Sequence, residues 1–274
     1  MFPMGTTNDR TPIVDEMETE HDETDSATTA HRNSVPVSSN PEVSTTSSIS
    51  ASFHIPWNFV RSCSNTMVYT LYTLMGGCSF VTLWFGMKSP SEMTVFQWHV
   101  VLCMIGYQLL MPYAMICLQS DSWMSALSYT HRRRAHWIMQ LLGSILAFVG
   151  SVIMSAHKTI NFTSLHGKFA LAALLFTIVS LANGVASLYT RQLRRYMPPR
   201  VSMLSHSLIG TLAFLLSSVC LIYGYVKHSF TEWASQEFAY VLVTITCIYT
   251  FLICFSPIYK VSRICFEEIK SKIF

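Results

Sequence analysis

Residues 132–156 read RRRAHWIMQLLGSILAFVGSVIMSA, three arginines followed by a long apolar run that holds a single histidine. Residues 136–156 contain no Asp, Glu, Lys or Arg. At a rise of about 1.5 Å per residue, a helix of this length crosses a hydrocarbon core about 30 Å thick. A continuous helix also satisfies its own backbone hydrogen bonds in lipid. This stretch therefore predicts a transmembrane helix.

Five further apolar runs of similar length accompany this one. Together the predicted spans cover residues 66–87, 94–117, 136–156, 165–189, 203–226 and 236–258. The loops between them are short, so we expect successive helices to be antiparallel. The sequence therefore predicts an all-α integral membrane protein with six transmembrane helices in a lipid bilayer.

The composition also indicates that the bilayer is the solvent. The chain is 51% hydrophobic and 12% charged, whereas an average soluble domain is about 25% charged. Nine of its 15 acidic residues lie within residues 1–42. Residues 1–55 cannot bury enough apolar surface to offset their ordering entropy, so we expect a disordered, acidic, Ser/Thr-rich tail there. The membrane domain is expected at 56–262 and a short basic tail at 263–274.

The distribution of basic residues predicts the orientation. An even number of spans places both termini on the same side of the membrane. Of the 18 Lys and Arg residues, all except Lys88, Lys158, Lys168 and Lys227 fall on that side. We therefore expect both termini and the basic tail to be cytoplasmic. The sequon Asn161-Phe162-Thr163 falls on the predicted outer side.

Four histidines stand in the first turns of spans two to five: His99, His136, His166 and His206. Ionisable residues inside spans are rare and often functional. Because helix direction alternates, we expect His99 and His166 near the outer face and His136 and His206 near the cytoplasmic face. Two imidazoles from facing helices can ligate a haem iron on both axial positions. The pattern predicts a central four-helix bundle of spans two to five that holds two haems, one per pair.

The residues four and seven positions after each histidine share its helix face. Small side chains there would leave a groove wide enough for a flat porphyrin, whereas close packing of membrane helices is the alternative explanation. These positions are Cys103, Gly106, Gln140, Gly143, Ala170, Ala173, Gly210 and Ala213.

A different class of function remains open, a haem-free transporter or scaffold with a histidine-lined path. Such a protein would favour broken helices and acidic residues within its spans. Spans two to five contain no Asp or Glu, which argues against it. The HxxxH boxes of membrane diiron enzymes and the HExxH motif of zinc proteases are also absent from the sequence.

The motifs around the four histidines resemble the cytochrome b-561 family over about residues 64–262. Phe96-Gln97-Trp98-His99 is similar to the start of the family's second helix, and residues 132–140 to the start of its third. Ser164-Leu165-His166-Gly167 and Ser205-His206-Ser207 are similar to the fourth and fifth. The HW-x-x-Q run and the HK pair at 157–158 resemble the domain-containing protein 2 branch of the family. Val100 departs from the proline usual there, which changes backbone stiffness but not ligation.

The resemblance implies a transmembrane ascorbate-dependent reductase. Members of the family take an electron from cytoplasmic ascorbate, pass it through two haem b groups, and deliver it to monodehydroascorbate or ferric iron on the outer side. Members of the family are often dimers, so a homodimer is one candidate assembly, and an endomembrane, the endoplasmic reticulum or a vesicle, is favoured over the plasma membrane. No nucleic-acid partner is expected.

Candidate substrate residues follow from charge and from the resemblance. Ascorbate is a monoanion at neutral pH, so its site should be cationic. Arg134 and Arg200 precede the inner histidines and are candidates, although the positive-inside rule alone also places arginines in these loops. His157 and Lys158 end the third span near the outer pair, where the family uses a histidine at its outer substrate site.

Overall fold

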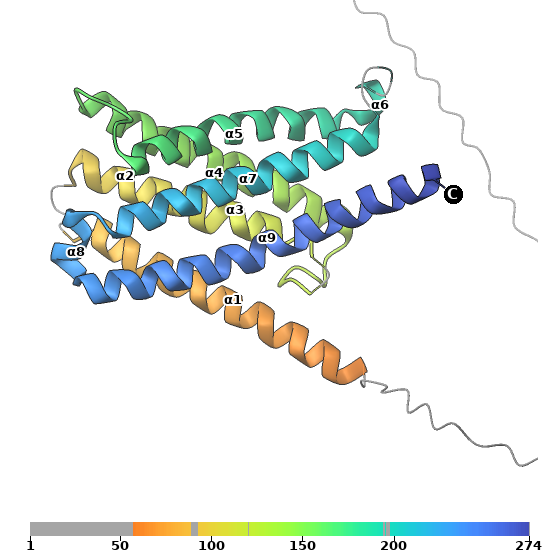
Figure 1. Ribbon diagram of the computed structural model, residues 1–274, viewed down its shortest axis with the longest axis horizontal. Helices are drawn as coiled ribbons and strands as arrows, with labels where there is room; N and C mark the ends of the chain where they lie inside the picture. Colours follow the sequence, from red (N-terminus) through yellow and green to blue (C-terminus); the bar gives the residue numbers. More distant parts are fainter. Residues whose placement is uncertain (1–56, 89–92, 120, 194, 196–197, 274) are drawn as a thin grey trace, which may run out of the picture. The chain divides into compact units, whose positions relative to one another are not determined.

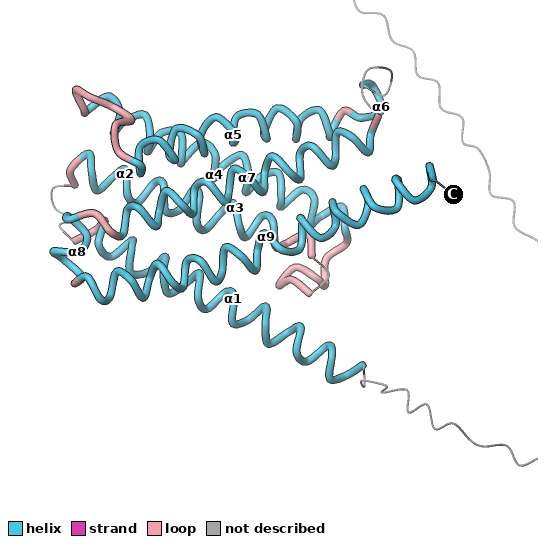
Figure 2. The backbone as a smooth tube through the Cα atoms, in the orientation of Figure 1, coloured by secondary structure: helices cyan, strands magenta, loops and turns pink. Residues whose placement is uncertain are grey.

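The computed structural model describes residues 57–88, 93–119, 121–193, 195 and 198–273. The predicted disordered tail at 1–55 lies outside these residues. Contacts along the chain separate residues 1–53 from residues 54–274, and the description below concerns the second unit. Within the described ranges every regular element is a helix, as Figure 2 shows.

Six described helical segments are long and apolar enough to cross a membrane, which confirms the predicted multi-pass architecture. They are Thr66–Gly86, Val95–Ile116, Tyr129–His157, Leu165–Leu188, Pro199–Tyr225 and Gln236–Ser271. The long helices of the bundle are α1 (Trp57–Gly86), α4 (Tyr129–His157), α5 (Leu165–Leu188), α7 (Pro199–Tyr225) and α9 (Gln236–Ile273) (Figure 1). The second span consists of α2 (Val95–Cys103), η1 (Met104–Leu110) and α3 (Met111–Ile116), and the short helices α6 (Thr190–Leu193) and α8 (His228–Ala234) lie in connections.

Side-chain caps fix where two of the histidine-bearing helices begin. Thr94 forms a capping box with Gln97: its Oγ1 accepts from the Gln97 N–H at 3.3 Å, and Gln97 Oε1 accepts from the Thr94 N–H at 2.8 Å. Ser164 Oγ accepts from the Gly167 N–H at 3.3 Å at the start of α5. Such caps satisfy backbone donors that a helix start leaves unpaired. The first turns of α2 and α5, which carry histidines, are therefore firmly placed.

The second span is not a uniform α-helix, because residues Met104–Leu110 form a π-helix. In a regular helix the ring of Pro112 would clash with the carbonyl of Gln108 and leave it without a donor. The π segment ends two residues before this proline, and its wider turn rotates the following residues relative to α2. Positions counted from His99 at a constant helical period therefore go out of register after Cys103.

The bundle consists of two helix pairs. The second span packs along α4, and α5 packs along nearly all of α7, whereas contact between α4 and α5 is slight. Helices α1 and α9 pack against each other, α1 also against α2 and α9 also against α7. The four-helix arrangement of spans two to five agrees with the prediction, with α1 and α9 added along one side (Figure 1).

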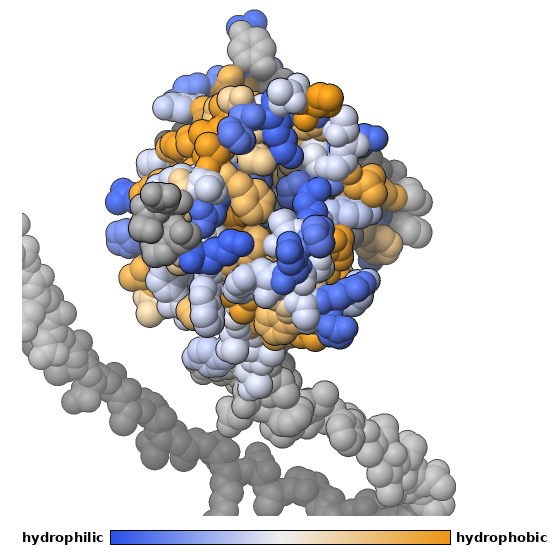
Figure 3. Space-filling model, turned by 90° about the vertical axis from the view of Figure 1, so that its left-hand side faces the viewer, coloured by the Kyte–Doolittle hydropathy of each residue, from blue (hydrophilic) through white to orange (hydrophobic). Residues whose placement is uncertain are grey.

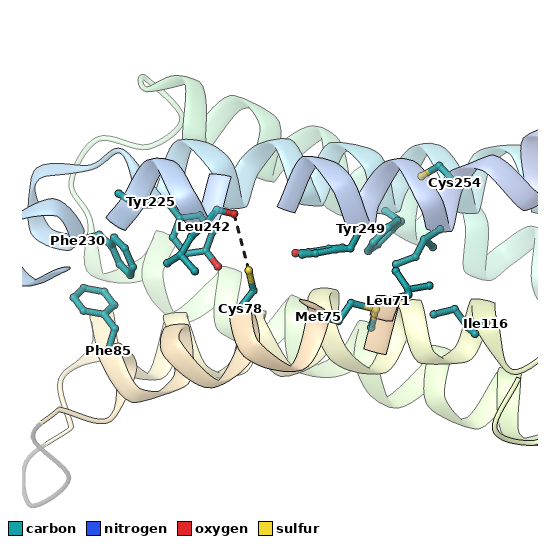
Figure 4. Packing of buried hydrophobic residues seen from close by; sticks show 13 residues of the cluster. Leu71, Met75, Cys78, Phe85, Ile116, Tyr225, Phe230, Leu242, Tyr249 and Cys254 are labelled. Atoms are coloured by element: carbon teal, nitrogen blue, oxygen red, sulfur yellow. Dashed lines mark hydrogen bonds between the residues drawn. The ribbon is translucent and has the colours of Figure 1, made fainter. Parts of the chain in front are cut away.

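Apolar packing and buried polar contacts attach the two outer helices to the bundle. Figure 4 shows α1 and α9 with Cys78 facing the Leu242 carbonyl within a cluster of buried apolar side chains. Tyr249 of α9 donates to Gln108 Oε1 at 2.8 Å, and the hydroxyls of Thr82 and Tyr225 are 2.7 Å apart. Between membrane helices, polar contacts of this kind supplement van der Waals packing.

The sixth helix extends well beyond the predicted span. Helix α9 continues to Ile273, so the expected tail from residue 263 is helical as far as it is described. Arg200 at the start of α7 pairs with Glu268 on this extension, with 3.3 Å between Nη1 and Oε2. Both side chains are largely exposed, so the pair adds little stability.

Gly106 and Gly143 bring the second span against α4 at backbone distance. A Cβ added at Gly106 would lie 2.5 Å from the Gly143 carbonyl oxygen, and one at Gly143 would lie 2.9 Å from the Gly106 carbonyl oxygen. The expectation that these two residues form a porphyrin groove is therefore wrong. Their missing side chains permit direct helix contact, which is the alternative explanation.

We expect Gly106→Ala to lower the free energy of unfolding by about 1–3 kcal/mol, the usual cost of forcing atoms into a packed interface. Gly77→Ala on α1 is the matched control, because an added Cβ there meets no atom within 4 Å. Thermal unfolding of both variants in the same detergent measures the difference. Equal stability of the two variants would contradict the packing argument.

Candidate functional site

The structure brings the four histidines together as two pairs. The rings of His99 on α2 and His166 on α5 have centroids 6.2 Å apart and planes at 81°. The rings of His136 on α4 and His206 on α7 also have centroids 6.2 Å apart, with planes at 90°. These are the two pairs that helix direction predicts, and they lie near opposite ends of the bundle.

Each of the four rings is held by a bond to the main chain of a neighbouring helix. A carbonyl oxygen can only accept, so the Nδ1–H donates and the ring is fixed as the tautomer whose Nε2 keeps a lone pair. The bonds run from His99 to Gly150 at 2.8 Å, from His136 to Ala114 at 2.7 Å, from His166 to Cys220 at 2.9 Å and from His206 to Ser180 at 3.0 Å.

These bonds brace each helix pair at both of its ends. The His99 bond joins α2 to α4, and the His136 bond joins α4 to α3 at the other end of the same helix pair. Likewise the His166 bond joins α5 to α7, and the His206 bond joins α7 to α5. Each histidine pair takes one ring from each braced helix pair. Any group held between the two rings would therefore also bridge the seam where α4 and α5 touch only slightly.

A cavity adjoins each histidine pair. The cavity at His99 and His166 has a volume of about 110 Å³, and that at His136 and His206 a volume of about 360 Å³. Both have mainly apolar walls, as cofactor sites usually do. Most of the positions four and seven residues after a histidine line one of these two cavities, and only Gly106 and Gly143 do not. The lining positions are Cys103, Gln140, Ala170, Ala173, Gly210 and Ala213.

These residues fit a haem with two axial imidazoles. Metal–imidazole bonds of about 2.0–2.1 Å on both sides of one ion leave the two ring centroids roughly 6 Å apart, which agrees with the observed 6.2 Å. Within the described residues no group of three or more His, Cys, Asp or Glu could hold a metal ion by itself. A porphyrin supplies the four remaining nitrogens that two imidazoles lack.

Comparison with known proteins agrees with this geometry. The sequence model of eukaryotic cytochrome b561 matches residues 98–232, which include all four histidines. Over these residues the chain is similar to the cytochrome b561 family. The similarity to this family points to b-type haem as the group that the histidine pairs would hold.

The chain is also similar to proteins named transmembrane reductase CYB561D2. The human and mouse proteins are each 31% identical to it over 143 residues, which is 50% of this chain and 64% of theirs. The bovine protein is 29% identical over 155 residues, which is 55% of this chain and 69% of its own. They belong to the branch whose motifs the sequence resembles. The chain thus matches somewhat less than two thirds of the human and mouse proteins, and no solved structure matches it.

Two glycines that sequence reasoning missed lie beside two of the histidine rings. A Cβ at Gly184 would lie 3.1 Å from Cε1 of His206, and one at Gly224 would lie 3.6 Å from Cε1 of His166. Each glycine stands four residues after the carbonyl that its histidine contacts, at Ser180 and Cys220. This spacing is visible in the sequence, but it acquires meaning only once the helix pairing is known.

At the His99–His166 end a further cavity of about 550 Å³ reaches both rings. Of the two residues expected there, Lys158 lines this cavity, whereas His157 is exposed and lies outside the lining. Lys227, which follows α7 closely, also lines it. The sequence identified Lys227 merely as one of four lysines on the outer side.

At the His136–His206 end the cation in the cavity lining comes from an unexpected helix. Lys260 of α9 lines the cavity together with Tyr129 and Gln119. Arg134 and Arg200 are exposed and outside the lining, and Arg200 pairs with Glu268. The sixth span carries no histidine ligand candidate, so sequence reasoning had no reason to assign it a part in the site.

We expect Gly184→Ala to perturb the ligand geometry at His206 and Gly224→Ala to leave that at His166 nearly unchanged. At 3.1 Å the new methyl group must displace the His206 ring by a few tenths of an ångström, whereas 3.6 Å is ordinary van der Waals contact. Electron paramagnetic resonance of the oxidised protein, which is sensitive to axial ligand orientation, measures both effects. A larger change in Gly224→Ala than in Gly184→Ala would refute this account of the ring supports.

Proposed function

We propose that this protein is a transmembrane ascorbate-dependent reductase that holds two haem b groups and carries single electrons across the membrane. The observation that carries the proposal is the 6.2 Å separation of both imidazole pairs, each with its Nδ1 bound to the main chain. The names of the relatives support a reductase, since the human and mouse proteins are called transmembrane reductases.

In this proposal His99 and His166 hold the outer haem and His136 and His206 hold the inner one. A haem held by such a histidine pair would supply one-electron transfer. The four main-chain carbonyls set the tautomer and the orientation of the rings and make Nε2 a better donor. The mainly apolar walls of both cavities would limit the access of water to a haem held there.

The donor site is proposed at the His136–His206 end, on the cytoplasmic side. The loops at this end carry most of the basic residues of the chain, which is the positive-inside pattern. Ascorbate loses one electron there, becomes monodehydroascorbate and releases one proton. Lys260 is the cation placed to contact the anion. Arg134 and Arg200 are exposed, so they attract ascorbate at longer range.

The acceptor site is proposed at the His99–His166 end, on the outer side, with Lys158 in its wall. There the electron reduces ferric iron to ferrous iron, or it joins a proton in converting monodehydroascorbate to ascorbate. The family resemblance further supports a homodimer in an endomembrane, the endoplasmic reticulum or a vesicle.

Replacing single histidines tests the ligand assignment. The purified protein should hold two haems per chain, and each His→Ala variant should hold one. His136→Ala and His206→Ala should lose the same component of the reduced absorption spectrum, and His99→Ala and His166→Ala the other, because each iron takes its ligands from one pair. Each pair serves as the control for the other. Loss of one and the same component in His99→Ala and His136→Ala would overturn the assignment, and absence of haem bands from the wild type would favour a histidine-lined transporter.

Replacing Lys260 tests the donor site. Loss of one charge contact of about 1 kcal/mol should raise the KM for ascorbate about fivefold in Lys260→Gln. Reduction by dithionite should not change, because that reaction does not use the site. Lys270→Gln removes the same charge from an exposed position on the same helix and should leave the KM unchanged. Reconstituted vesicles given ascorbate on one side at a time report the sidedness, and equal rates from both sides would contradict the proposed orientation.

A further inference from the structure

The outer pair, His99 with His166, differs from the inner pair in its sulfur neighbours. Cys103 Sγ lies 3.6 Å from Nδ1 of His99, and Cys220 Sγ lies 3.4 Å from Nδ1 of His166. Within the described part of the chain no thiol makes such a contact with a ring of the inner pair. The starts of α2 and α5, which carry the outer pair, belong to the end of the molecule that Figure 3 views, where hydrophilic and apolar side chains are intermixed.

Each of these two thiols turns its hydrogen away from the ring beside it. Cys220 Sγ donates to the main-chain carbonyl of His166 at 3.3 Å, and Cys103 Sγ donates to the Ala147 carbonyl at 3.8 Å. A thiol has one hydrogen to donate, so its sulfur offers lone pairs to the Nδ1–H of the ring. The sulfur is thus placed to share that hydrogen with the main-chain carbonyl that already accepts it, as in a three-centre bond.

Close packing holds both thiols in place. A Cβ added at Gly150 would lie 2.9 Å from Cys103 Sγ, and the carbonyl of the same glycine accepts from His99 at 2.8 Å. Cys220 contacts His166 with its carbonyl at 2.9 Å and also with its sulfur, which is 3.9 Å from Nε2 and therefore nearer to Nδ1. The sulfur positions follow from the same backbone contacts that orient the two rings.

At the inner pair a thiol acts on the carbonyl instead of on the ring. Cys117 Sγ donates to the Ala114 carbonyl oxygen at 3.1 Å, and the same oxygen accepts from Nδ1 of His136 at 2.7 Å. Two donors then draw on the electron density of one oxygen, so each receives less of it. This thiol therefore weakens the acceptor of its histidine, whereas each outer thiol adds an acceptor.

The electron density of an imidazole that binds a metal depends on the bond at its other ring nitrogen. A stronger acceptor at Nδ1–H makes Nε2 a better electron donor. A better donor stabilises ferric iron, the more positive state, relative to ferrous iron and so lowers the reduction potential. The added sulfur acceptors at one pair and the weakened carbonyl at the other therefore shift the potential in opposite directions.

We propose that Cys103 and Cys220 are positioning residues that lower the reduction potential of a haem held by the outer pair, and that Cys117 raises that of a haem held by the inner pair. The inference rests on the proposed function, because it requires haem at both pairs. The three thiols supply no ligand to iron and take no part in a reaction step. They make two histidine pairs of equal ring separation unequal in potential.

Spectroelectrochemical titration of the purified haem protein tests the outer thiols. Each haem is identified by the absorption component that its histidine variants lose. In Cys103→Ala/Cys220→Ala the ratio of ferrous to ferric outer haem at a fixed applied potential should rise about tenfold, the scale of losing an outer-shell partner, which equals about 59 mV for one electron. The inner haem should keep its potential. Cys103→Ser/Cys220→Ser retains acceptor atoms and should remain closer to the wild type.

The same titration tests the inner thiol. Cys117→Ala frees the Ala114 carbonyl for His136, so the potential of the inner haem should fall while that of the outer haem stays unchanged. Cys254→Ala is the matched control, because it removes a buried thiol from the apolar cluster that attaches the outer helices. This control should change neither potential.

The sign of the shift separates tuning from packing. Loss of packing alone would admit water beside the outer haem, which favours ferric iron, so a lower potential in Cys103→Ala/Cys220→Ala would overturn the proposal. An unchanged outer potential, or an equal shift of both haems, would overturn it as well and would leave the two-haem reductase standing. Wild-type protein without haem would instead refute the proposed function. If the double variant loses its outer haem, the two single variants provide the same test.

Discussion

The arrangement of this protein depends on the bond between an imidazole N–H and a main-chain carbonyl of the next helix. A carbonyl within a helix already accepts one intrahelical bond, but its second lone pair remains available. A histidine that uses it is fixed in one tautomer and one direction, and the two helices are joined by the same contact. Four such bonds serve all four histidines, from 2.7 Å at His136 to 3.0 Å at His206. The same interaction therefore fixes the orientation of each histidine ring and joins the two helices.

This constraint explains why the bundle is built from two pairs rather than from four equivalent helices. The second span with α4, and α5 with α7, are braced internally and packed closely, and the Gly106–Gly143 contact shows how close the first pair is. Between the pairs, contact is slight and the cavities adjoin the histidines. A flat group with a ligand on each face would complete this seam. Helices α1 and α9 contribute no ring, yet Tyr249 and Tyr225 attach them through polar contacts, and α9 places Lys260 in a cavity wall.

Hydropathy sufficed to predict the six spans, because the length of apolar sequence needed to cross a bilayer is a property of one helix alone. The histidine pairs also followed from the sequence, since helix direction alternates with each span. The π segment could not be predicted in this way, because the accommodation of Pro112 in the second span leaves no signal in hydropathy. The roles of Gly106, Gly184, Lys227 and Lys260 depend on which atoms of another helix lie opposite, and a single sequence does not contain that information. Arg134 and Arg200 were expected from loop charge, which indicates the side of the membrane but not the direction of a side chain.

The two ends of the bundle present the same sign of charge to their ligands. Lys260 lines the cavity at one end and Lys158 and Lys227 that at the other, and no described lining residue at either end is an aspartate or glutamate. Under the proposed function, ascorbate and monodehydroascorbate are both anions, so each site suits the reduced and oxidised forms of this one molecule. The sites themselves then give the electron no preferred direction. Direction must come from the supply of reductant and oxidant on the two sides and from the relative potentials of the two haems, which burial and hydrogen bonding around each histidine pair adjust.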